Sequence, residues 1–466
     1  MMIKNYPQGY IPLFLNYSIG NFCFYSLRSL LVLYLTSVFL FSDGQAFDLY
    51  GTFMALSYLT PVFCGWLSDS VLGTRFSILV GGSLVFIGCL LFLVPQDTWF
   101  ILGLMLLSLG IGFLKPTTLS AVGSLFPDKR SAEKDGAYTT LYVGMNIGSA
   151  LGPLICGWIG HMYGWHFVFP LIGGAVFLAS LFCCSKLKSV VVTQPLKKMS
   201  NIVVLTTILS ILGFGSFVCF CLVYSNHMNL LIPMIILSNL SCLGFMYQKS
   251  SAENRRNLLQ IGGLMILFAL FCSVFEQAGS SMTLFIDRCV DRSLLSGQIP
   301  TESFQSLNPF LVIIIGSLIA RGCIIKHTKD WGVFEKFLIG FLFTGLSFFV
   351  LGVILLFANA RLISPLWIVL VFSIQVMGEF YIIPIGFSAV SKLSPQKYTS
   401  FIMGLWSISI ACGHYIASLL AKFSSLSKPT DIPQSLDSYQ LFFTSISFIP
   451  FSAVLIIGIG IWYYKR

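Results

Sequence analysis

Four ionisable side chains lie inside long apolar stretches of this 466-residue chain, namely Arg28, Lys115, Glu276 and Glu379. An isolated charge at the centre of a bilayer costs about 2.5–3.5 kcal/mol on insertion scales. Four unpaired charges would together cost about 10 kcal/mol, which is comparable to the whole stability of a domain. We therefore expect these side chains to face a wet cavity, to pair with one another, or both.

The signs of these charges are segregated along the chain, with both bases in the amino-terminal half and both acids in the carboxy-terminal half. Arginine and lysine can hold a carboxylate, and a glutamate can hold an ammonium group or a proton. Because intramembrane ionisable groups usually mark a substrate or ion path, we interpret them as a gate. Ion pairs between the two halves would form when one end of the cavity closes. Static structural pairs are the alternative interpretation.

The elements that must position these residues are apolar helices. The chain is 56% hydrophobic and only 9% charged, with a mean hydropathy of +0.88, whereas soluble domains carry about a quarter charged residues. A membrane-spanning helix needs about 20 apolar residues. Fourteen such runs are predicted, at 11–41, 47–68, 76–95, 98–123, 137–160, 164–184, 202–221, 227–247, 259–286, 306–325, 333–357, 365–390, 398–422 and 440–463. The sequence therefore predicts an all-α integral membrane protein.

The loops between these runs indicate the orientation of the chain. Of the 27 Lys and Arg residues, twenty fall on one face, together with both termini. The opposite face receives five basic residues, which are Arg288, Arg292, Arg361, Lys422 and Lys428. Because cytoplasmic loops hold the excess of Lys and Arg, both termini are expected in the cytoplasm. The net charge of +10 thus reflects topology rather than nucleic-acid binding.

The most polar internal stretches, 185–201 and 248–258, bracket the seventh and eighth runs. We therefore expect an N-terminal six-helix bundle over 1–185, a linker with an inserted helix pair over 186–258, and a C-terminal six-helix bundle over 259–466. Two six-span halves are the architecture of major facilitator transporters, with the substrate near midplane. The cysteines lack metal-ligand spacing, and no nucleophile elbow or nucleotide loop is present, so no metal, cofactor or enzyme activity is expected.

Several motifs give the chain a recognisable pattern. They are "GWLSDSVLGTR" (65–75), "GIGFLKPTTLS" (110–120), "YTTLYVGMNIGSALGPLICG" (138–157), "FEQAGSSMTLFID" (275–287), "QSLNPFLVIIIGSLIA" (305–320), "MGEFYIIPIGFSAVSKLSP" (377–395) and "FIMGLWSIS" (401–409). In this order on these spans, the chain resembles the proton-dependent oligopeptide transporter family of the major facilitators.

The resemblance implies symport of di- and tripeptides with protons. It implies that Arg28 and Lys115 hold the peptide carboxylate and that Glu379 holds the amino group. Asn146 and Asn308 would bind termini or backbone, while Tyr25, Tyr58 and Trp406 would shape side-chain pockets. The outer-gate pairs would be Arg28–Glu276 and Lys115–Glu379, and Asp69 and Arg75 would belong to a structural loop motif. Ordinary packing is the alternative for the aromatic and Asn residues.

The first span departs from the family pattern. The family carries a Glu-x-x-Glu-Arg motif there, whereas this chain has Tyr17, Gly20 and Asn21 at those positions. The first aromatic of the following pair is Phe24 rather than Tyr, and a seventh-span Trp position is Cys272. Two readings stay open. One is a peptide carrier that uses Glu276 or Glu379 for protons or works as a facilitator, and the other is a carrier for another small anionic metabolite or amino acid.

The resemblance further implies a bacterial inner membrane protein that works as a monomer. The expected partners are a small peptide substrate, protons and the lipid bilayer, with no nucleic acid.

Overall fold

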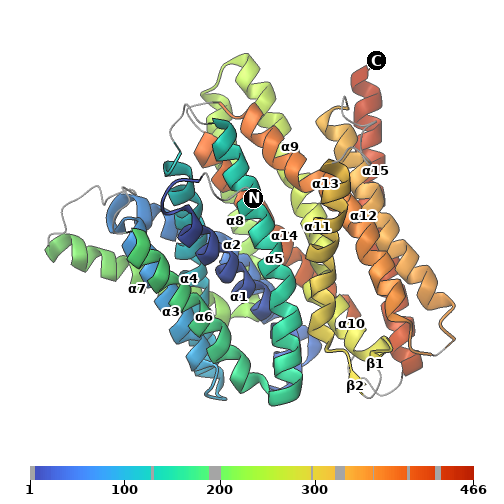
Figure 1. Ribbon diagram of the computed structural model, residues 1–466. Helices are drawn as coiled ribbons and strands as arrows, with labels where there is room; N and C mark the ends of the chain where they lie inside the picture. Colours follow the sequence, from blue (N-terminus) through green and yellow to red (C-terminus); the bar gives the residue numbers. More distant parts are fainter. Residues whose placement is uncertain are drawn as a thin grey trace. The chain divides into compact units, whose positions relative to one another are not determined.

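In the computed structural model, the apolar runs form long α-helices (Figure 1). The structure describes residues 6–126, 131–187, 201–294, 297–320, 331–359, 361–395, 399–425 and 432–465. Part of the expected linker, residues 188–200, lies outside the described residues. Twelve of the described helices are long and apolar enough to cross a membrane. The predicted all-α membrane class is confirmed.

The chain forms two compact units. Unit 1 consists of Met1–Leu31, Leu56–Ser225 and Glu302–Pro309, and unit 2 consists of Val32–Ala55, Asn226–Thr301 and Phe310–Arg466. Helices α1 (Tyr10–Ser37), α2 (Asp43–Leu67) and α11 (Leu307–Ala320) contribute to both units. The domain bounds expected from the sequence stay a prediction.

Unit 1 also contains five complete helices, which are α3 (Thr74–Leu91), α4 (Asp97–Ser124), α5 (Ser131–Tyr163), α6 (Trp165–Lys186) and α7 (Asn201–Val223). Helices α3 and α4 approach closely at small residues. A Cβ atom on Gly88 would lie 2.8 Å from the carbonyl oxygen of Gly103, so a larger residue would force the helices apart. Helix α7 packs on α4, and the Phe214 ring stacks on Phe63 of α2 with centroids 4.2 Å apart.

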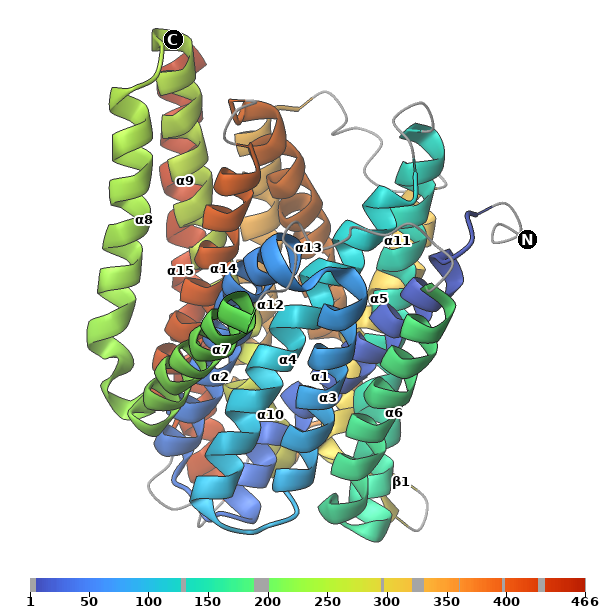
Figure 2. The same ribbon diagram turned by 90° about the vertical axis from the view of Figure 1, so that its left-hand side faces the viewer.

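Unit 2 contains the remaining helices, which are α8 (Leu231–Gln248), α9 (Ala252–Phe275), α10 (Ser281–Cys289), α12 (Val333–Leu356), α13 (Pro365–Leu393), α14 (Thr399–Ala421) and α15 (Ile432–Lys465). Helices α8 and α9 run side by side (Figure 2). A short hairpin pairs β1 (Ser293–Leu294) with β2 (Gly297–Gln298). If α9 and α10 are counted as one interrupted span, the twelve long apolar helices together with α2 and α8 give the expected order of fourteen helices.

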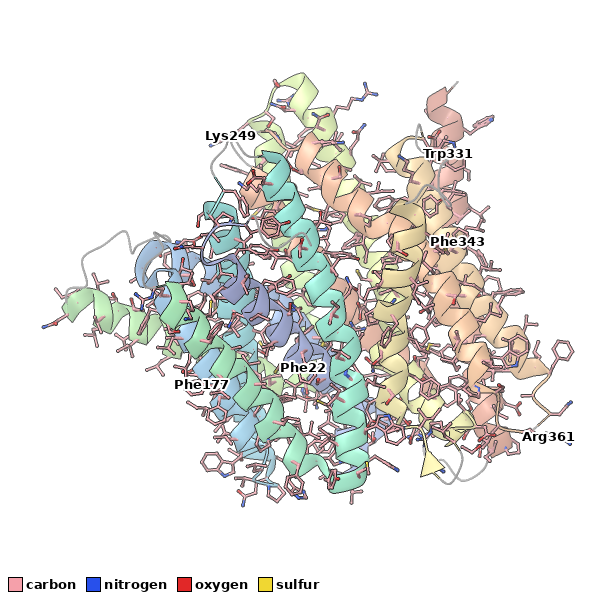
Figure 3. The ribbon with its side chains drawn as sticks, in the orientation of Figure 1. Phe22, Phe177, Lys249, Trp331, Phe343 and Arg361 are labelled. Atoms are coloured by element: carbon pink, nitrogen blue, oxygen red, sulfur yellow. The ribbon has the colours of Figure 1, made fainter. Side chains whose placement is uncertain are left out.

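The two ends of unit 2 agree with the alternation of loops expected from the sequence. In Figure 3, Lys249 and Trp331 lie at one end of the unit and Arg361 lies at the other. The segments that follow α10 and precede α13 meet at the Arg361 end, where Val290 bridges to Ile363. The hairpin lies at the same end (Figure 1). These are the loops that the charge pattern assigns to the non-cytoplasmic face.

The remaining short elements interrupt or extend the long helices. They are the π-helix η2 (Ser68–Leu72) and the 3-10 helices η5 (Ser225–Leu230), η6 (Glu276–Gly279), η7 (Thr301–Ser306) and η10 (Lys422–Ser424). Gly73, which ends η2, has φ +72°, a conformation that side-chain-bearing residues rarely adopt.

Candidate functional site

The two predicted cations of unit 1 lie beside aromatic rings from helices α1 and α2. The Nζ atom of Lys115 (α4) lies 3.6 Å from the centroid of the Phe24 ring (α1) and 5.6 Å from that of Tyr58 (α2). The Arg28 guanidinium lies 5.6 Å from the Tyr25 ring centroid. The Phe24 ring contacts both Tyr25 and Tyr58 edge-on. The structure therefore brings together Tyr25, Arg28, Tyr58 and Lys115, four of the predicted site residues.

This geometry stabilises a cation without a carboxylate. An ammonium or guanidinium group over an aromatic face gains about 0.5–2 kcal/mol, depending on how far it is desolvated. Among the described residues of unit 1, the Lys115 ammonium contacts the rings of Phe24 and Tyr58, and the cavity beside it is lined by no carboxylate. Rings carry no formal charge, so the contacts with Phe24 and Tyr58 leave the Lys115 ammonium uncompensated by those neighbours.

A small cavity adjoins Lys115 at the positions where the first span departs from the family pattern. Its volume is about 10 Å³, and it is lined by residues of α1 and α4, namely Asn16, Tyr17, Gly20, Asn21, Ile111, Leu114, Lys115 and Thr118. That volume suffices for about one water molecule. The Asn21 amide donates to the carbonyl oxygen of Tyr17 at 2.8 Å. Apart from Lys115, the residues that line this cavity are uncharged, and both polar and apolar side chains are among them.

Two further predicted residues of unit 1 lie on other helices. Asn146 (α5) is buried and donates from Nδ2 to the carbonyl oxygen of Tyr142 at 2.9 Å, within its own helix. Asn308, near the start of α11, is partly exposed. Their predicted contacts with peptide termini stay predictions.

Glu276 of unit 2 lies at a helix break. Helix α9 ends at Phe275, η6 follows, and α10 begins at Ser281. Ser280, between η6 and α10, has φ −123° and ψ −100°, which is not helical. The Gln277 side chain holds the break in place, because its Nε2 donates to the carbonyl oxygens of Ser273 at 3.1 Å and Ala417 at 2.9 Å. Broken helices in transporters line binding sites near midplane.

A histidine on α14 faces this break. The Nδ1 atom of His414 lies 3.5 Å from Oε2 of Glu276, and His414 is only 1% exposed. The sequence singles out His414 as a deep polar group but offers no means of assigning its partner.

The other two predicted residues of unit 2 differ in burial. Glu379, in α13, is partly exposed. Trp406, in α14, is fully buried in a hydrophobic cluster and stacks on Phe268 with ring centroids 4.3 Å apart. In this conformation the Trp406 ring therefore contacts core residues, and its predicted role in a side-chain pocket stays a prediction.

The loop-motif residues lie at the junction of α2 and α3. Asp69 is exposed within η2, and Arg75 lies in the first turn of α3, where its carbonyl oxygen accepts a contact from the Cys184 thiol at 3.1 Å. The twelve cysteines that the structure describes are free thiols.

Two ion pairs that sequence reasoning missed tie the start of α2 into unit 2. Arg288 (α10) donates from Nη1 and Nη2 to the two carboxylate oxygens of Asp43, both at 2.7 Å. Lys422 (η10) pairs with Asp48 at 2.5 Å. Both acids are buried, and both bases belong to the five assigned to the non-cytoplasmic face. A signal existed, because that face holds only five of the 27 Lys and Arg residues beside eight of the 17 Asp and Glu residues, so each of its bases has acids within reach along the face.

The predicted gate pairs, Arg28–Glu276 and Lys115–Glu379, each join a residue of unit 1 to a residue of unit 2. They stay predictions.

The chain folds into long apolar helices with charged side chains buried among them, and one helix is broken at a glutamate. This combination defines a multi-pass membrane transporter of the major facilitator type. The profile of the POT family matches residues 75–435, which is most of the chain. The chain therefore belongs to the POT family, and the resemblance indicated by the motifs is confirmed.

Individual relatives cover nearly the whole chain. The Bacillus subtilis protein named uncharacterized transporter YclF is 27% identical over 436 residues, which is 89% of this chain and 88% of its own. Dipeptide and tripeptide permease B of Yersinia enterocolitica is 27% identical over 474 residues, 99% of this chain and 95% of its own. A crystal structure of peptide transporter POT in complex with sulfate is 25% identical, with a TM-score of 0.86 over 98% of this chain and 94% of the other.

Proposed function

We propose that this protein imports di- and tripeptides by alternating access and couples that import to protons. The observation that carries the proposal is the cluster of Arg28 and Lys115 on aromatic rings in unit 1. A peptide zwitterion with variable side chains needs a fixed positive site for its carboxylate. The arginine fork can hold two carboxylate oxygens, while the lysine supplies a mobile point charge. The relatives named as peptide permeases support the same substrate class.

The acids of unit 2 complete the proposed site. Glu379 would hold the peptide amino group, and Asn146 and Asn308 would bind termini or backbone. Tyr25, Tyr58 and Trp406 would shape the pockets for peptide side chains. Because an ion pair that holds a cavity closed must break before the cavity opens, Arg28–Glu276 and Lys115–Glu379 would exchange partners with the peptide during transport.

The ion pairs of unit 2 indicate which end of that unit is held together in this conformation. Asp43–Arg288 and Asp48–Lys422 join the start of α2 to α10 and η10. With the termini in the cytoplasm, these pairs lie at the outer end, and this conformation holds that end of unit 2 together. Uptake from outside would require both pairs to separate once in each cycle.

The proposed setting is a bacterial cell membrane, with several spans, both termini in the cytoplasm and a monomer as the functional unit. We propose no enzymatic step, because a carrier of this kind changes the location of the peptide and not its covalent structure.

The test is uptake of labelled dialanine into proteoliposomes, with and without an inward proton gradient. We expect accumulation above the external concentration with the gradient, and loss of uptake in Arg28→Met. Unlabelled dipeptides should compete for uptake, while single amino acids and small organic anions should not.

The same competition panel judges the second candidate, a carrier for another small anionic metabolite or amino acid. The family's two first-span acids are replaced by Tyr17 and Gly20 and its arginine by Asn21, which favours that candidate because it removes net negative charge beside Lys115. If a dicarboxylate or an amino acid competes and dialanine does not, the peptide proposal is wrong.

A further inference from the structure

A groove in unit 2 opens between α9, α12 and α15 at the end of the unit where Trp331 lies (Figure 3). It is lined by residues from Gln260 to Leu267 on α9, by the start of α12 and by residues from Ile456 to Ile461 on α15. Its volume is about 640 Å³, and pockets that bind small molecules measure about 300–1,000 Å³. All of its lining residues belong to unit 2, so the groove is a feature of that unit alone.

The groove exists because α12 and α15 diverge toward this end. Deeper in the unit the two helices are in contact, since a Cβ atom on Gly345 would lie 2.9 Å from the Phe451 ring. Nearer the groove, a Cβ atom on Gly458 would lie 3.8 Å from Leu338, and one on Gly460 would meet nothing within 4 Å. Protein interiors leave few voids larger than a water molecule. A gap of this size is therefore expected to hold something other than side chains of the described residues.

The groove opens on an apolar face of unit 2. Its floor includes Ile457, which is 6% exposed, and its rim includes Ile456 and Ile266, which are 68% and 56% exposed. On a spanning helix, a face as apolar as this borders the lipid tails. The α9 wall from Gln260 to Leu267 is about 10 Å long at 1.5 Å per residue, which is about two thirds of one leaflet of a hydrocarbon layer 30 Å thick. The groove thus has the depth of an acyl chain.

Charged and polar groups gather at the mouth of the groove. Arg256 is exposed and precedes Gln260 by four residues, so the two lie on one face of α9, and Gln260 lines the groove. At the opposite wall, the Glu335 carboxylate accepts the backbone N–H of Gly332 at 2.5 Å, and Trp331 is 42% exposed. A guanidinium fork suits a phosphate group, and tryptophan is typical of the depth of lipid headgroups.

We propose that this groove binds one phospholipid of the cytoplasmic leaflet, with an acyl chain between α9, α12 and α15 and the phosphate group at Arg256. An acyl chain is thin and unbranched, so it fits a gap whose walls carry no side chain at Gly263 and Gly460, where a Cβ atom would meet nothing within 4 Å. The leaflet follows from the orientation proposed above. The site itself needs no peptide and no proton, so it stands apart from the proposed transport.

The experiment is photo-crosslinking of the whole delipidated protein in dodecyl maltoside micelles. The probe is a phosphatidylglycerol with a diazirine in one acyl chain, and mass spectrometry locates the adducts. We expect labelling of the groove segments of α9 and α15 to saturate as the probe concentration rises. Labelling that rises in proportion to the probe without saturating overturns the inference, because transient contact with the apolar surface behaves in that way.

Variants that fill the groove provide the second comparison. Gly263→Phe and Gly460→Phe should fold, because the added side chain enters open space, and each should abolish the saturable labelling. Gly174→Phe on α6 is the matched control, since a Cβ atom there also meets nothing within 4 Å, and it should label as wild type does. Saturable labelling that survives in both groove variants overturns the inference. If neither variant folds, the wild-type adducts decide, because saturable adducts confined to other helices also overturn it.

The role of Arg256 is tested separately. Arg256→Gln should raise the half-saturating probe concentration about tenfold, which is the typical contribution of a hydrogen bond between charged groups. Arg255→Gln is the control, because the Arg255 guanidinium donates to the carbonyl oxygens of Tyr247 and Gln248 on α8, and it should leave that concentration unchanged. If a free fatty acid displaces the probe as well as unlabelled phosphatidylglycerol does, and Arg256→Gln has no effect, the assignment to a phospholipid is wrong.

Discussion

Replacement of Arg288 by Met tests how the outer end of unit 2 is held together. The substitution removes both 2.7 Å hydrogen bonds to Asp43. The two side chains are only 16% and 7% exposed, so the Asp43 carboxylate would stay buried without its bidentate arginine partner. Breaking a buried pair on one side costs about 3–5 kcal/mol, whereas replacing both partners by uncharged residues is often neutral. We therefore expect Arg288→Met to lower the free energy of unfolding by that amount.

The double variant Asp43→Asn/Arg288→Met provides the control. We expect it to recover most of the lost stability, which gives a coupling energy of at least about 2 kcal/mol between the two positions. Unfolding in mixed micelles with increasing SDS, followed by Trp fluorescence, measures all four free energies. If the effects of the two single substitutions simply add, the reasoning is wrong.

The same variants report on the conformational cycle. Cys289 follows Arg288 and is fully buried, so it should react slowly with a membrane-impermeant maleimide while the outer end is closed. In Arg288→Met we expect its labelling, quantified by peptide mass spectrometry, to be several-fold faster. Unchanged labelling would mean that the pair contributes to stability without holding this end closed.

Three further outcomes are expected. Gly20→Glu should fold, because a Cβ atom at Gly20 meets nothing within 4 Å. It should also steepen the pH dependence of dialanine uptake, because the new carboxyl group would lie at the cavity that contains Lys115. Gly148→Ala, by contrast, should express poorly, because its Cβ would lie 2.9 Å from the backbone nitrogen of Phe22. Lys115→Met should abolish dialanine uptake and Lys115→Arg should raise its KM, because the guanidinium is larger than the ammonium and would displace the charge that lies 3.6 Å from the Phe24 ring centroid. Trp406→Ala should cost about 3–5 kcal/mol in the SDS titration, since the ring is fully buried against Phe268. A flat pH profile in Gly20→Glu would contradict the first expectation, and unimpaired uptake in Lys115→Met would contradict the second. A cost below about 1 kcal/mol in Trp406→Ala would contradict the third.

The helices could be predicted from the sequence because hydrophobic runs of spanning length leave the backbone few alternatives. Arg28 and Lys115 could be predicted because a charge in such a run is costly, and the structure places both on aromatic rings. The break at Glu276 has no such signal. It interrupts a run whose length and hydropathy predict one continuous span, and Gln277 stabilises it through a contact with Ala417, far away in the chain.

The sequence did not predict that Asp43 and Asp48 would be buried in ion pairs. They stand at the start of a span, where acidic residues are ordinary and a solvated position is the simplest expectation. Their burial depends on Arg288 and Lys422, which are supplied by the far end of the chain. Pairings of this kind are tertiary, so a single sequence reveals the charges and not the partners. The inserted pair is a similar case, since α7 packs on α4 in unit 1 and α8 packs on α9 in unit 2.

The surroundings of Lys115 bear on why the missing first-span acids matter. A lysine that is already paired with a carboxylate gains little from a second anion, because its charge is compensated. Lys115 instead contacts the Phe24 and Tyr58 rings and a cavity the size of one water molecule, and neither compensates its charge. We therefore expect the loss of the acids to strengthen the attraction of this site for a substrate carboxylate while removing a place for the proton. Substrate binding and proton binding would then be divided between unit 1 and unit 2, and Gly20→Glu would weaken dialanine binding as it restores the acid.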